Sequence, residues 1–178
     1  DEPLKLECTR SLLDTLLKDY PAQYATEDGT RPVCKWANCK TTLKDIDTSR
    51  LHFLQLPKNY IRVDFDLKDG TGRKSRELNL KAASEWPKTY MEFSKSGAGI
   101  HAYYIYLGDV NELSNSYADD IEIKVSTGNA SARRKLTYCN DIPVAILSSG
   151  LPLKKGGIPM GIAYLKMILE FLQLMDLA

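Results

Sequence analysis

Two aspartates near the middle of the chain are spaced so that their side chains could bind a divalent cation together. Asp64 and Asp66 lie in the segment Asn59–Lys68, where apolar and polar residues alternate as in a strand with one buried face. Residues i and i+2 of a strand project to the same side about 6.5 Å apart, and two such carboxylates can clamp one ion or two ions roughly 4 Å apart. The alternative is a pair on a solvated strand face, but aspartate is a poor strand former, which favours a functional role.

A loop of small residues, followed by a histidine, could bind phosphate. The segment 94–99 reads Ser-Lys-Ser-Gly-Ala-Gly, and His101 begins the next alternating segment. Glycine lets backbone N–H groups approach a phosphate closely, and hydroxyl groups and a lysine add donors. The imidazole of His101 could bond a triphosphate oxygen or orient a ligand, although a lone histidine is commonly structural. The candidate phosphate-binding residues of this loop are Ser94, Ser96, Gly97 and Gly99.

Two later segments add an acidic residue and three basic ones. In the segment Ile121–Val125, Glu122 and Lys124 alternate with apolar residues and therefore share one strand face. Glu122 could complete a site of three carboxylates, or it could lie on an exposed face without a role. Arg133 and Arg134 come just before another predicted strand, and the arginine guanidinium is suited to bidentate phosphate contact.

Taken in order, these segments resemble the three motifs of the archaeo-eukaryotic primase superfamily, in the style of the primase-polymerase domains of phages, prophages and plasmids. In that family an acidic pair on a strand comes first, and a small-residue turn ending in histidine comes second. An acidic residue between apolar residues, often with a lysine two positions on, comes third. Residues 64–66, 96–101 and 121–124 match this order, and the resemblance covers about residues 55–150. Glu122 departs from the pattern, since many relatives carry aspartate there.

The resemblance implies a DNA primase-polymerase, which performs template-directed, metal-dependent nucleotidyl transfer for replication priming and extension. Asp64, Asp66 and Glu122 would bind two Mg²⁺ or Mn²⁺ ions, and His101 would be the fourth catalytic residue. The implied nucleotide-binding residues are Ser94, Ser96, Gly97, Gly99, His101, Lys124, Arg133 and Arg134. The implied partners are a single-stranded DNA template, ribo- or deoxynucleoside triphosphates, and a helicase in the same polypeptide or replisome.

Two other functions could use the same residues. A metal-dependent nuclease or phosphohydrolase could be built on the same carboxylates, because a two-metal site serves hydrolysis as well as transfer. A non-catalytic DNA-binding replication module could retain the fold, and its affinity for DNA would survive loss of the carboxylates. Cys34 and Cys39 form a lone C-x4-C pair, and because zinc usually requires a second pair of ligands, unliganded thiols are the favoured interpretation.

The elements that must position these residues alternate between extended and helical patterns. Short links between the later strands predict an α+β fold with a largely antiparallel sheet and packed helices, and the resemblance adds an RRM-like catalytic core. Residues 22–58 break into short strands and turns. Helices are predicted at 9–20, 74–85 and 159–178, and strands at 59–68, 89–93, 101–107, 121–125, 135–139 and 144–147.

The composition predicts a soluble protein with one main core. Of the 178 residues, 43% are apolar and 26% charged, and no apolar run approaches the ~20 residues that cross a bilayer. With the resemblance, this predicts no membrane partner and a cytoplasmic location in a bacterial cell or phage-infected host. A net charge of +1 neither requires nor excludes nucleic acid, and basic residues cluster at 35–50, 73–76 and 133–135. We expect a catalytic domain at 1–150 and, at 151–178, a helical segment that begins an accessory region or linker of a longer protein.

Overall fold

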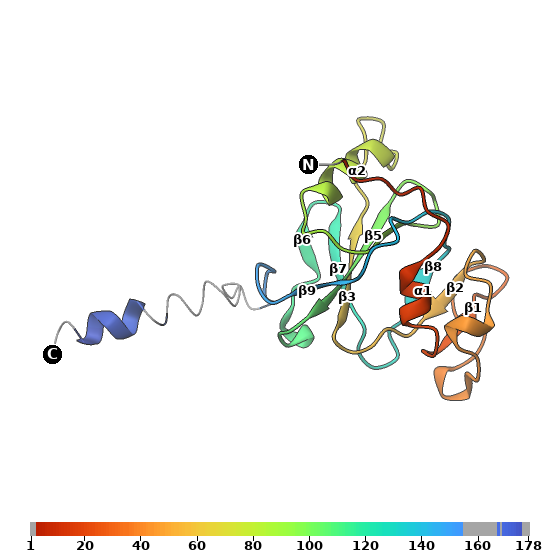
Figure 1. Ribbon diagram of the computed structural model, residues 1–178, viewed down its shortest axis with the longest axis horizontal. Helices are drawn as coiled ribbons and strands as arrows, with labels where there is room; N and C mark the ends of the chain where they lie inside the picture. Colours follow the sequence, from red (N-terminus) through yellow and green to blue (C-terminus); the bar gives the residue numbers. More distant parts are fainter. Residues whose placement is uncertain (1–2, 155–166, 168, 176–178) are drawn as a thin grey trace.

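The chain folds into two β-sheets that lie side by side, with short helices around them (Figure 1). The computed structural model describes residues 3–154, 167 and 169–175. The larger sheet, called the main sheet below, has the order β4-β5-β3-β7-β6, with β9 paired to β5. Its strands are β3 (Tyr60–Phe65), β4 (Met91–Phe93), β5 (Ile100–Tyr106), β6 (Ser116–Ala118), β7 (Ile121–Val125) and β9 (Ala145–Leu147).

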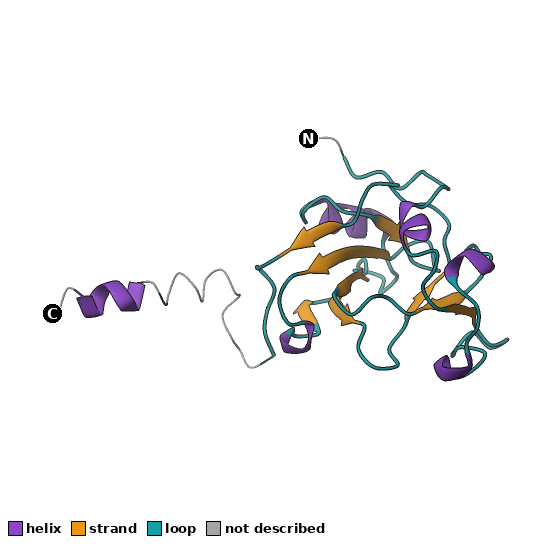
Figure 2. Cartoon of the chain, turned by 60° about the horizontal axis from the view of Figure 1, so that its bottom comes forward, coloured by secondary structure: helices purple, strands orange, loops and turns teal. Residues whose placement is uncertain are grey.

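The smaller sheet has the order β1-β2-β8 and is antiparallel throughout. Figure 2 shows the strands of the two sheets as separate groups, with the helices at the periphery. The strands are β1 (Ala22–Tyr24), β2 (His52–Leu54) and β8 (Ala132–Arg134). Within residues 3–154 the helical elements are α1 (Leu12–Leu16), η1 (Trp36–Asn38), η2 (Leu43–Asp45), α2 (Arg76–Ser84) and η3 (Val110–Glu112).

The predicted fold class is confirmed in its coarse form. Every strand pair in the main sheet is antiparallel except the parallel pair β5–β9. The alternating segments predicted at 59–68, 101–107 and 121–125 are the central strands β3, β5 and β7. The predicted helix 74–85 is α2, which begins where Ser75 accepts a hydrogen bond from the Leu78 amide.

Two predicted elements are corrected by the structure. The strand expected at 135–139 lies earlier, as β8, because the β8 backbone pairs with β2 while the following residues bond separate segments. The Leu136 amide donates to Thr48 and Cys139 pairs with Cys8, so no continuous ladder forms there. The opening helix, expected at 9–20, is the single short helix α1, because the chain leaves the helical conformation at Leu17.

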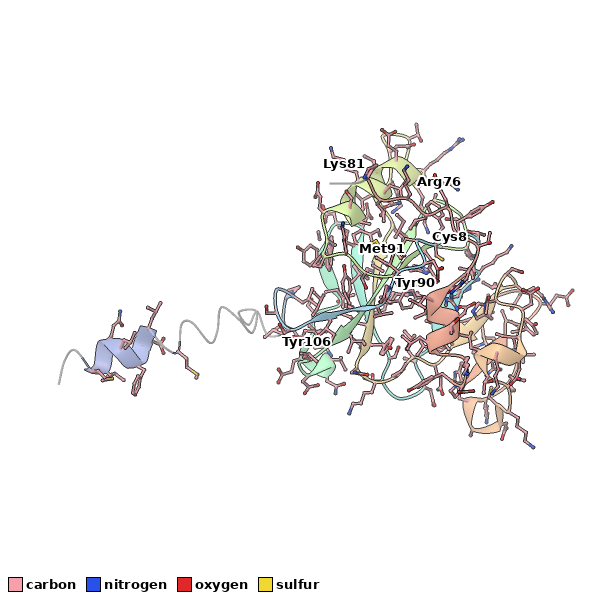
Figure 3. The ribbon with its side chains drawn as sticks, in the orientation of Figure 1. Cys8, Arg76, Lys81, Tyr90, Met91 and Tyr106 are labelled. Carbon is pink, nitrogen blue, oxygen red and sulfur yellow. The ribbon has the colours of Figure 1, made fainter. Side chains whose placement is uncertain are left out.

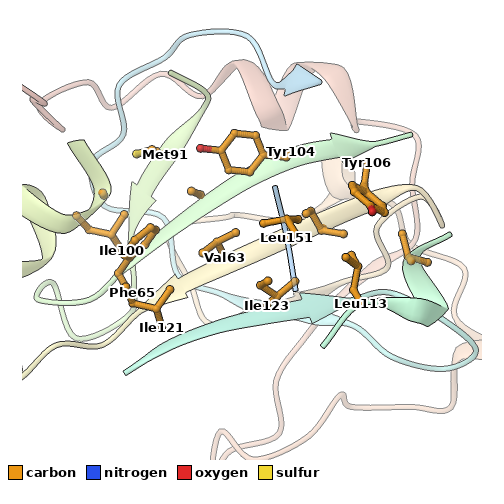
Figure 4. Close-up of a cluster of buried hydrophobic side chains, with 14 of the residues drawn as sticks. Val63, Phe65, Met91, Ile100, Tyr104, Tyr106, Leu113, Ile121, Ile123 and Leu151 are labelled. Carbon is orange, nitrogen blue, oxygen red and sulfur yellow. The ribbon is translucent and has the colours of Figure 1, made fainter. Parts of the chain in front are cut away.

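Apolar side chains cover one whole face of the main sheet. Because side chains alternate across a strand, the odd-numbered residues of β3 and β7 point to this face together, as Figure 4 shows for Val63, Phe65, Ile121 and Ile123. A second apolar cluster lies on the other face, next to α1 and the small sheet, and contains Leu13, Leu17, Leu54, Tyr90, Tyr103 and Ala132 among others. The opposite face of the main sheet is therefore shared between this second cluster and polar residues.

Residues 151–154 also pack on the main sheet. Leu151 is buried in the first cluster, Leu153 pairs with Leu113, and the Lys154 amide donates to Glu112. Packing on the main sheet thus continues to residue 154, four residues beyond the domain boundary expected at 150. Most of the helix expected at 159–178 lies outside the described residues, and the parts described, 167 and 169–175, are helical and exposed. In the described ranges no helix has the length and apolar character needed to cross a membrane.

The first apolar cluster should provide much of the stability. Ile61 of β3 is completely buried in it, so Ile61→Ala is expected to lower the free energy of unfolding by about 2–5 kcal/mol. Ile146 of β9 is 61% exposed, and Ile146→Ala should change the free energy of unfolding by less than about 0.5 kcal/mol. Urea unfolding followed by far-UV circular dichroism measures both values. Equal losses in the two variants would contradict this account of the core.

Candidate active site

The hydrogen-bond register of the main sheet places four ionisable residues in one row. Glu92 on β4 pairs with His101 on β5, His101 pairs with Asp64 on β3, and Asp64 pairs with Glu122 on β7. Directly opposite residues of antiparallel strands have their Cβ atoms about 4.5–5.5 Å apart on the same face. We call these residues the polar row. Three of its members were predicted as site residues from the sequence, and Glu92 was not.

His101 lies between two carboxylates of the polar row. Its Nε2 is 3.9 Å from Asp64 Oδ1, and its Nδ1 is 3.9 Å from Glu92 Oε2. The side chain is only 10% exposed, and Nδ1 is a buried atom with no hydrogen-bond partner in the part of the chain that the structure describes. Both distances exceed hydrogen-bond length, so the ring is flanked by two acceptors without being bonded to either.

Asp64 forms a bidentate ion pair with Arg62, two residues earlier on β3. Arg62 Nε is 2.8 Å from Oδ1 and its NH2 is 3.1 Å from Oδ2, while its NH1 donates to the Arg133 carbonyl at 2.9 Å. Burial, the largest single effect, would lower the pKa of Arg62, but Asp64 and Tyr103 together outweigh it and raise that pKa above its ordinary value. Arg62 therefore remains charged and orients Asp64.

Asp66 lies one residue beyond β3, where the glycine loop 94–99 approaches most closely. A Cβ atom added to Gly99 would lie 2.7 Å from Asp66 Oδ1, 2.8 Å from Ser94 Oγ and 3.1 Å from the Phe65 carbonyl oxygen. Only glycine leaves room for this contact. The structure thus brings Asp66 and Ser94 together through Gly99, and Lys74 Nζ neutralises Asp66 at 3.0 Å.

The glycine loop is held in place by α2. Gly97 has the positive φ of 75° that favours glycine, and its carbonyl accepts a hydrogen bond from Arg76 Nε at 2.8 Å. Figure 3 labels Arg76 on α2, and its guanidinium lies 4.4 Å from the centre of the Phe93 ring. Asn79, which is fully buried, donates to the Ala98 carbonyl and accepts from the Leu67 amide. These contacts hold the loop against the end of β3, and Ser96 Oγ lies 3.1 Å from Ser94 Oγ inside it.

Glu122 and Lys124 are exposed on β7. They pair with each other at 3.2 Å, and the Glu122 side chain is 61% exposed. Each of the three predicted metal ligands therefore has a cationic partner of its own, namely Arg62 for Asp64, Lys74 for Asp66 and Lys124 for Glu122. In the described ranges no three acidic, histidine or cysteine side chains converge closely enough to bind a metal. The donor set nevertheless suits Mg²⁺ or Mn²⁺, which prefer carboxylate oxygens.

The two arginines predicted to contact the nucleotide lie in β8, away from the glycine loop. Arg134 is completely buried, and its guanidinium donates to both oxygens of Glu92 and to Asp14. It has no surface with which to meet a nucleotide, so its predicted role is corrected to a buried ion pair. The Arg133 backbone carbonyl accepts a hydrogen bond from Arg62. The Arg133 side chain lies near Gly29, in the loop that follows β1.

Glu92 is the functional candidate that the sequence analysis missed. Burial, the largest single effect, would raise its pKa, but Arg134 and His101 together outweigh burial and hold the pKa of this carboxyl far below its ordinary value. Tyr90 and Tyr103 also donate to it, at 2.9 and 3.1 Å. One signal was available, because Glu92 is a charged residue within the otherwise apolar run Tyr90–Phe93, directly before the glycine loop.

The thiols of Cys34 and Cys39 lie in the loops beside the small sheet. The Cys34 side chain is exposed, and Cys39 Sγ donates to the carbonyls of Ala22 at 3.7 Å and Thr41 at 3.5 Å. Both thiols therefore lie beside the small sheet, on segments other than the four strands of the polar row.

Comparisons with known proteins add no relative. No model of a known protein family matches the chain, and no curated protein is similar in sequence. The function proposed below therefore rests on the geometry of the polar row and the glycine loop.

His52 should make stability depend on pH. It is fully buried on β2, its Nδ1–H donates to the Arg50 carbonyl and its Nε2 lies 3.2 Å from Arg134 NH1. Burial, with the charge of Arg134 second, lowers its pKa from 6.5 to about 4. The unfolded chain therefore binds this proton at a higher pH than the folded chain, and stability should fall by about 3 kcal/mol as the pH decreases from 6.5 to 4.

Urea unfolding between pH 7 and pH 4.5 measures this dependence. His52→Gln, which can still donate to Arg50 and accept from Arg134, should flatten the decline because it removes the titrating group. Parallel pH profiles of the free energy of unfolding for the wild type and the variant would rule out His52 as the source of the pH dependence.

Proposed function

We propose that this chain is the catalytic domain of a metal-dependent DNA primase-polymerase. The observation that supports the proposal is the register of the main sheet, in which His101, Asp64 and Glu122 are direct neighbours on three adjacent strands. The three sequence motifs that resemble the archaeo-eukaryotic primase superfamily thus lie side by side on one face. The α+β class of the chain, with its mostly antiparallel main sheet, supports the proposal in coarse form, and the RRM-like core is what the resemblance implies.

Asp64, Asp66 and Glu122 would hold the metal ions. When bound there, Mg²⁺ or Mn²⁺ supplies Lewis-acid chemistry that activates the attacking 3′ hydroxyl and neutralises the departing pyrophosphate. Asp64 is already oriented by Arg62, and Asp66 by the contact with Gly99. The lysine partners of Asp66 and Glu122 are about half exposed, and exposed ion pairs contribute little to stability. Lys74 and Lys124 can therefore leave their carboxylates and bind phosphate oxygens.

The glycine loop and His101 would receive the triphosphate. Ser94 and Ser96 hydroxyls lie at the turn, and Gly97 and Gly99 keep its backbone free of Cβ atoms near Asp66. Arg76, fixed on the loop through the Gly97 carbonyl, adds a positive charge at the same end of the sheet. The incoming nucleotide would thus lie between the loop and the polar row.

A single-stranded DNA template would bind through exposed basic residues. The segment 73–76 borders Asp66 and the glycine loop, and phosphate contacts of this kind weaken as salt increases. A helicase in the same polypeptide or replisome and a cytoplasmic location in a bacterial cell or infected host remain part of this proposal.

One observation favours a second candidate, a non-catalytic DNA-binding module. Both oxygens of Asp64 are engaged by the buried Arg62, as in a structural ion pair. Such a module would bind DNA equally well without its carboxylates. A nuclease or phosphohydrolase would use the same carboxylates but would cleave DNA in the absence of nucleotides.

Primer extension distinguishes these functions. A labelled primer on a single-stranded template is incubated with Mg²⁺ or Mn²⁺ and with ribo- or deoxynucleotides in turn. Asp64→Asn with Asp66→Asn should reduce extension by more than about 100-fold, because loss of metal ligands exceeds the 10- to 100-fold effect of outer partners. The wild type should also bind Mn²⁺ in calorimetry, and the double variant should not.

Glu112→Gln is the matched control, because Glu112 is an exposed carboxylate beyond the other end of β5. It should extend primers at the wild-type rate. Cleavage without nucleotides would indicate the hydrolase. DNA binding that is unchanged by loss of the carboxylates, with no extension in either metal, would indicate the binding module.

A further inference from the structure

A buried network of charges connects the small sheet to His101. Arg134 of β8 is enclosed, and its Nε and NH2 donate to the two oxygens of Glu92 at 2.8 Å each. Its NH2 also donates to Asp14 at 2.8 Å. The other end of the network reaches the site, since Glu92 Oε2 is the oxygen that lies 3.9 Å from His101 Nδ1.

Glu92 is held more firmly than packing alone requires. Its carboxylate accepts hydrogen bonds from Arg134 twice, from Tyr90 and from Tyr103. In Figure 3, Tyr90 lies between the main sheet and α1, where its hydroxyl also meets that of Ser11 at 2.7 Å. A buried ion pair seldom adds net stability compared with apolar residues of the same volume. The network therefore calls for a reason other than stability.

His101 supplies that reason. Its Nδ1 is buried without a hydrogen-bond partner among the described residues, and Glu92 is the acceptor that faces it. Hydrogen bonds of a catalytic group are often long before substrate binds and shorten in the complex. The opposite ring nitrogen, Nε2, faces Asp64 at 3.9 Å.

We propose that Glu92, fixed by Arg134, is a positioning residue for His101. It accepts the Nδ1–H of the imidazole, which selects the tautomer and ring orientation that leave Nε2 facing Asp64 and the incoming nucleotide. A histidine that acts on a ligand through one nitrogen commonly has its other nitrogen fixed by a carboxylate in this way. The effect of Glu92 on catalysis rests on the proposed function, whereas its effect on the tautomer does not.

The test uses a variant in which the ion pair is replaced rather than broken. Glu92→Met with Arg134→Met removes both charges and fills a similar volume, which buried ion pairs tolerate, and thermal unfolding establishes that it folds. Glu92→Asp is a second variant, which keeps a charge for Arg134 but withdraws the carboxylate from His101 by about 1.5 Å, one C–C bond. Asp14→Asn is the matched control, because it weakens a bond to Arg134 and leaves all four bonds to Glu92 intact.

Two readouts are needed. Two-bond ¹H–¹⁵N spectra report the tautomer of each imidazole, and the chain has only two histidines. His52, with its Nδ1–H donated to Arg50, serves as the internal reference in the wild type, Glu92→Asp and Asp14→Asn, which retain its neighbour Arg134. His101 should carry its proton on Nδ1 in the wild type and in Asp14→Asn, and should lose this preference in both Glu92 variants. Steady-state primer extension should show kcat/KM for the nucleotide reduced about 10- to 100-fold in the Glu92 variants and within about threefold of wild type in Asp14→Asn.

The outcomes separate the two proposals. A folded Glu92 variant with an unchanged His101 tautomer and unchanged kcat/KM would overturn the positioning role. A changed tautomer together with reduced kcat/KM supports it. If the wild type extends no primer, the proposed function fails, and the tautomer alone then decides whether Glu92 orients His101.

Discussion

The buried ion pair between Arg134 and Glu92 connects the two sheets to each other and to the candidate active site. It joins the small sheet to the main sheet, since Arg134 belongs to β8 and Glu92 to β4. Removing either partner alone would leave an uncompensated charge in a buried site, which costs several kcal/mol. Glu92 is also the direct cross-strand neighbour of His101 in the polar row, so the contact that joins the two sheets borders the candidate active site.

The second constraint is the position of β3 at the centre of the main sheet. Its antiparallel pairing with both β5 and β7 brings Asp64 opposite His101 and Glu122. A shift of one residue in either pairing would turn these side chains into the apolar core, because neighbouring residues of a strand face opposite sides. The apolar face of the same strands, with Ile61, Val63 and Phe65 fully buried, therefore fixes the register of the polar face.

The charges of the site balance one another in pairs. Arg62, Lys74 and Lys124 each neutralise one carboxylate, which keeps three like charges on one face from destabilising the sheet. The pairs differ in strength, because Arg62–Asp64 is buried and bidentate whereas the two lysine pairs are exposed. Asp66 and Glu122 can exchange partners readily, and Asp64 keeps its orientation while they do so.

The alternation of residue types determined the central strands β3, β5 and β7 and the side of the sheet on which Asp64, Glu122 and Lys124 lie, because a period of two is a local property of the chain. The helix α2 was likewise predictable from local signals, because Pro87 ends its helical pattern. Tertiary structure alone decided the strand order, the pairing of β8 with β2, and the burial of Arg134, because these depend on contacts between residues far apart in sequence. Arg134 and Lys135 are equally basic neighbours, yet one is fully buried and the other exposed. The contacts of Arg134 with Glu92, 42 residues earlier along the chain, and with Asp14, 120 residues earlier, account for the difference.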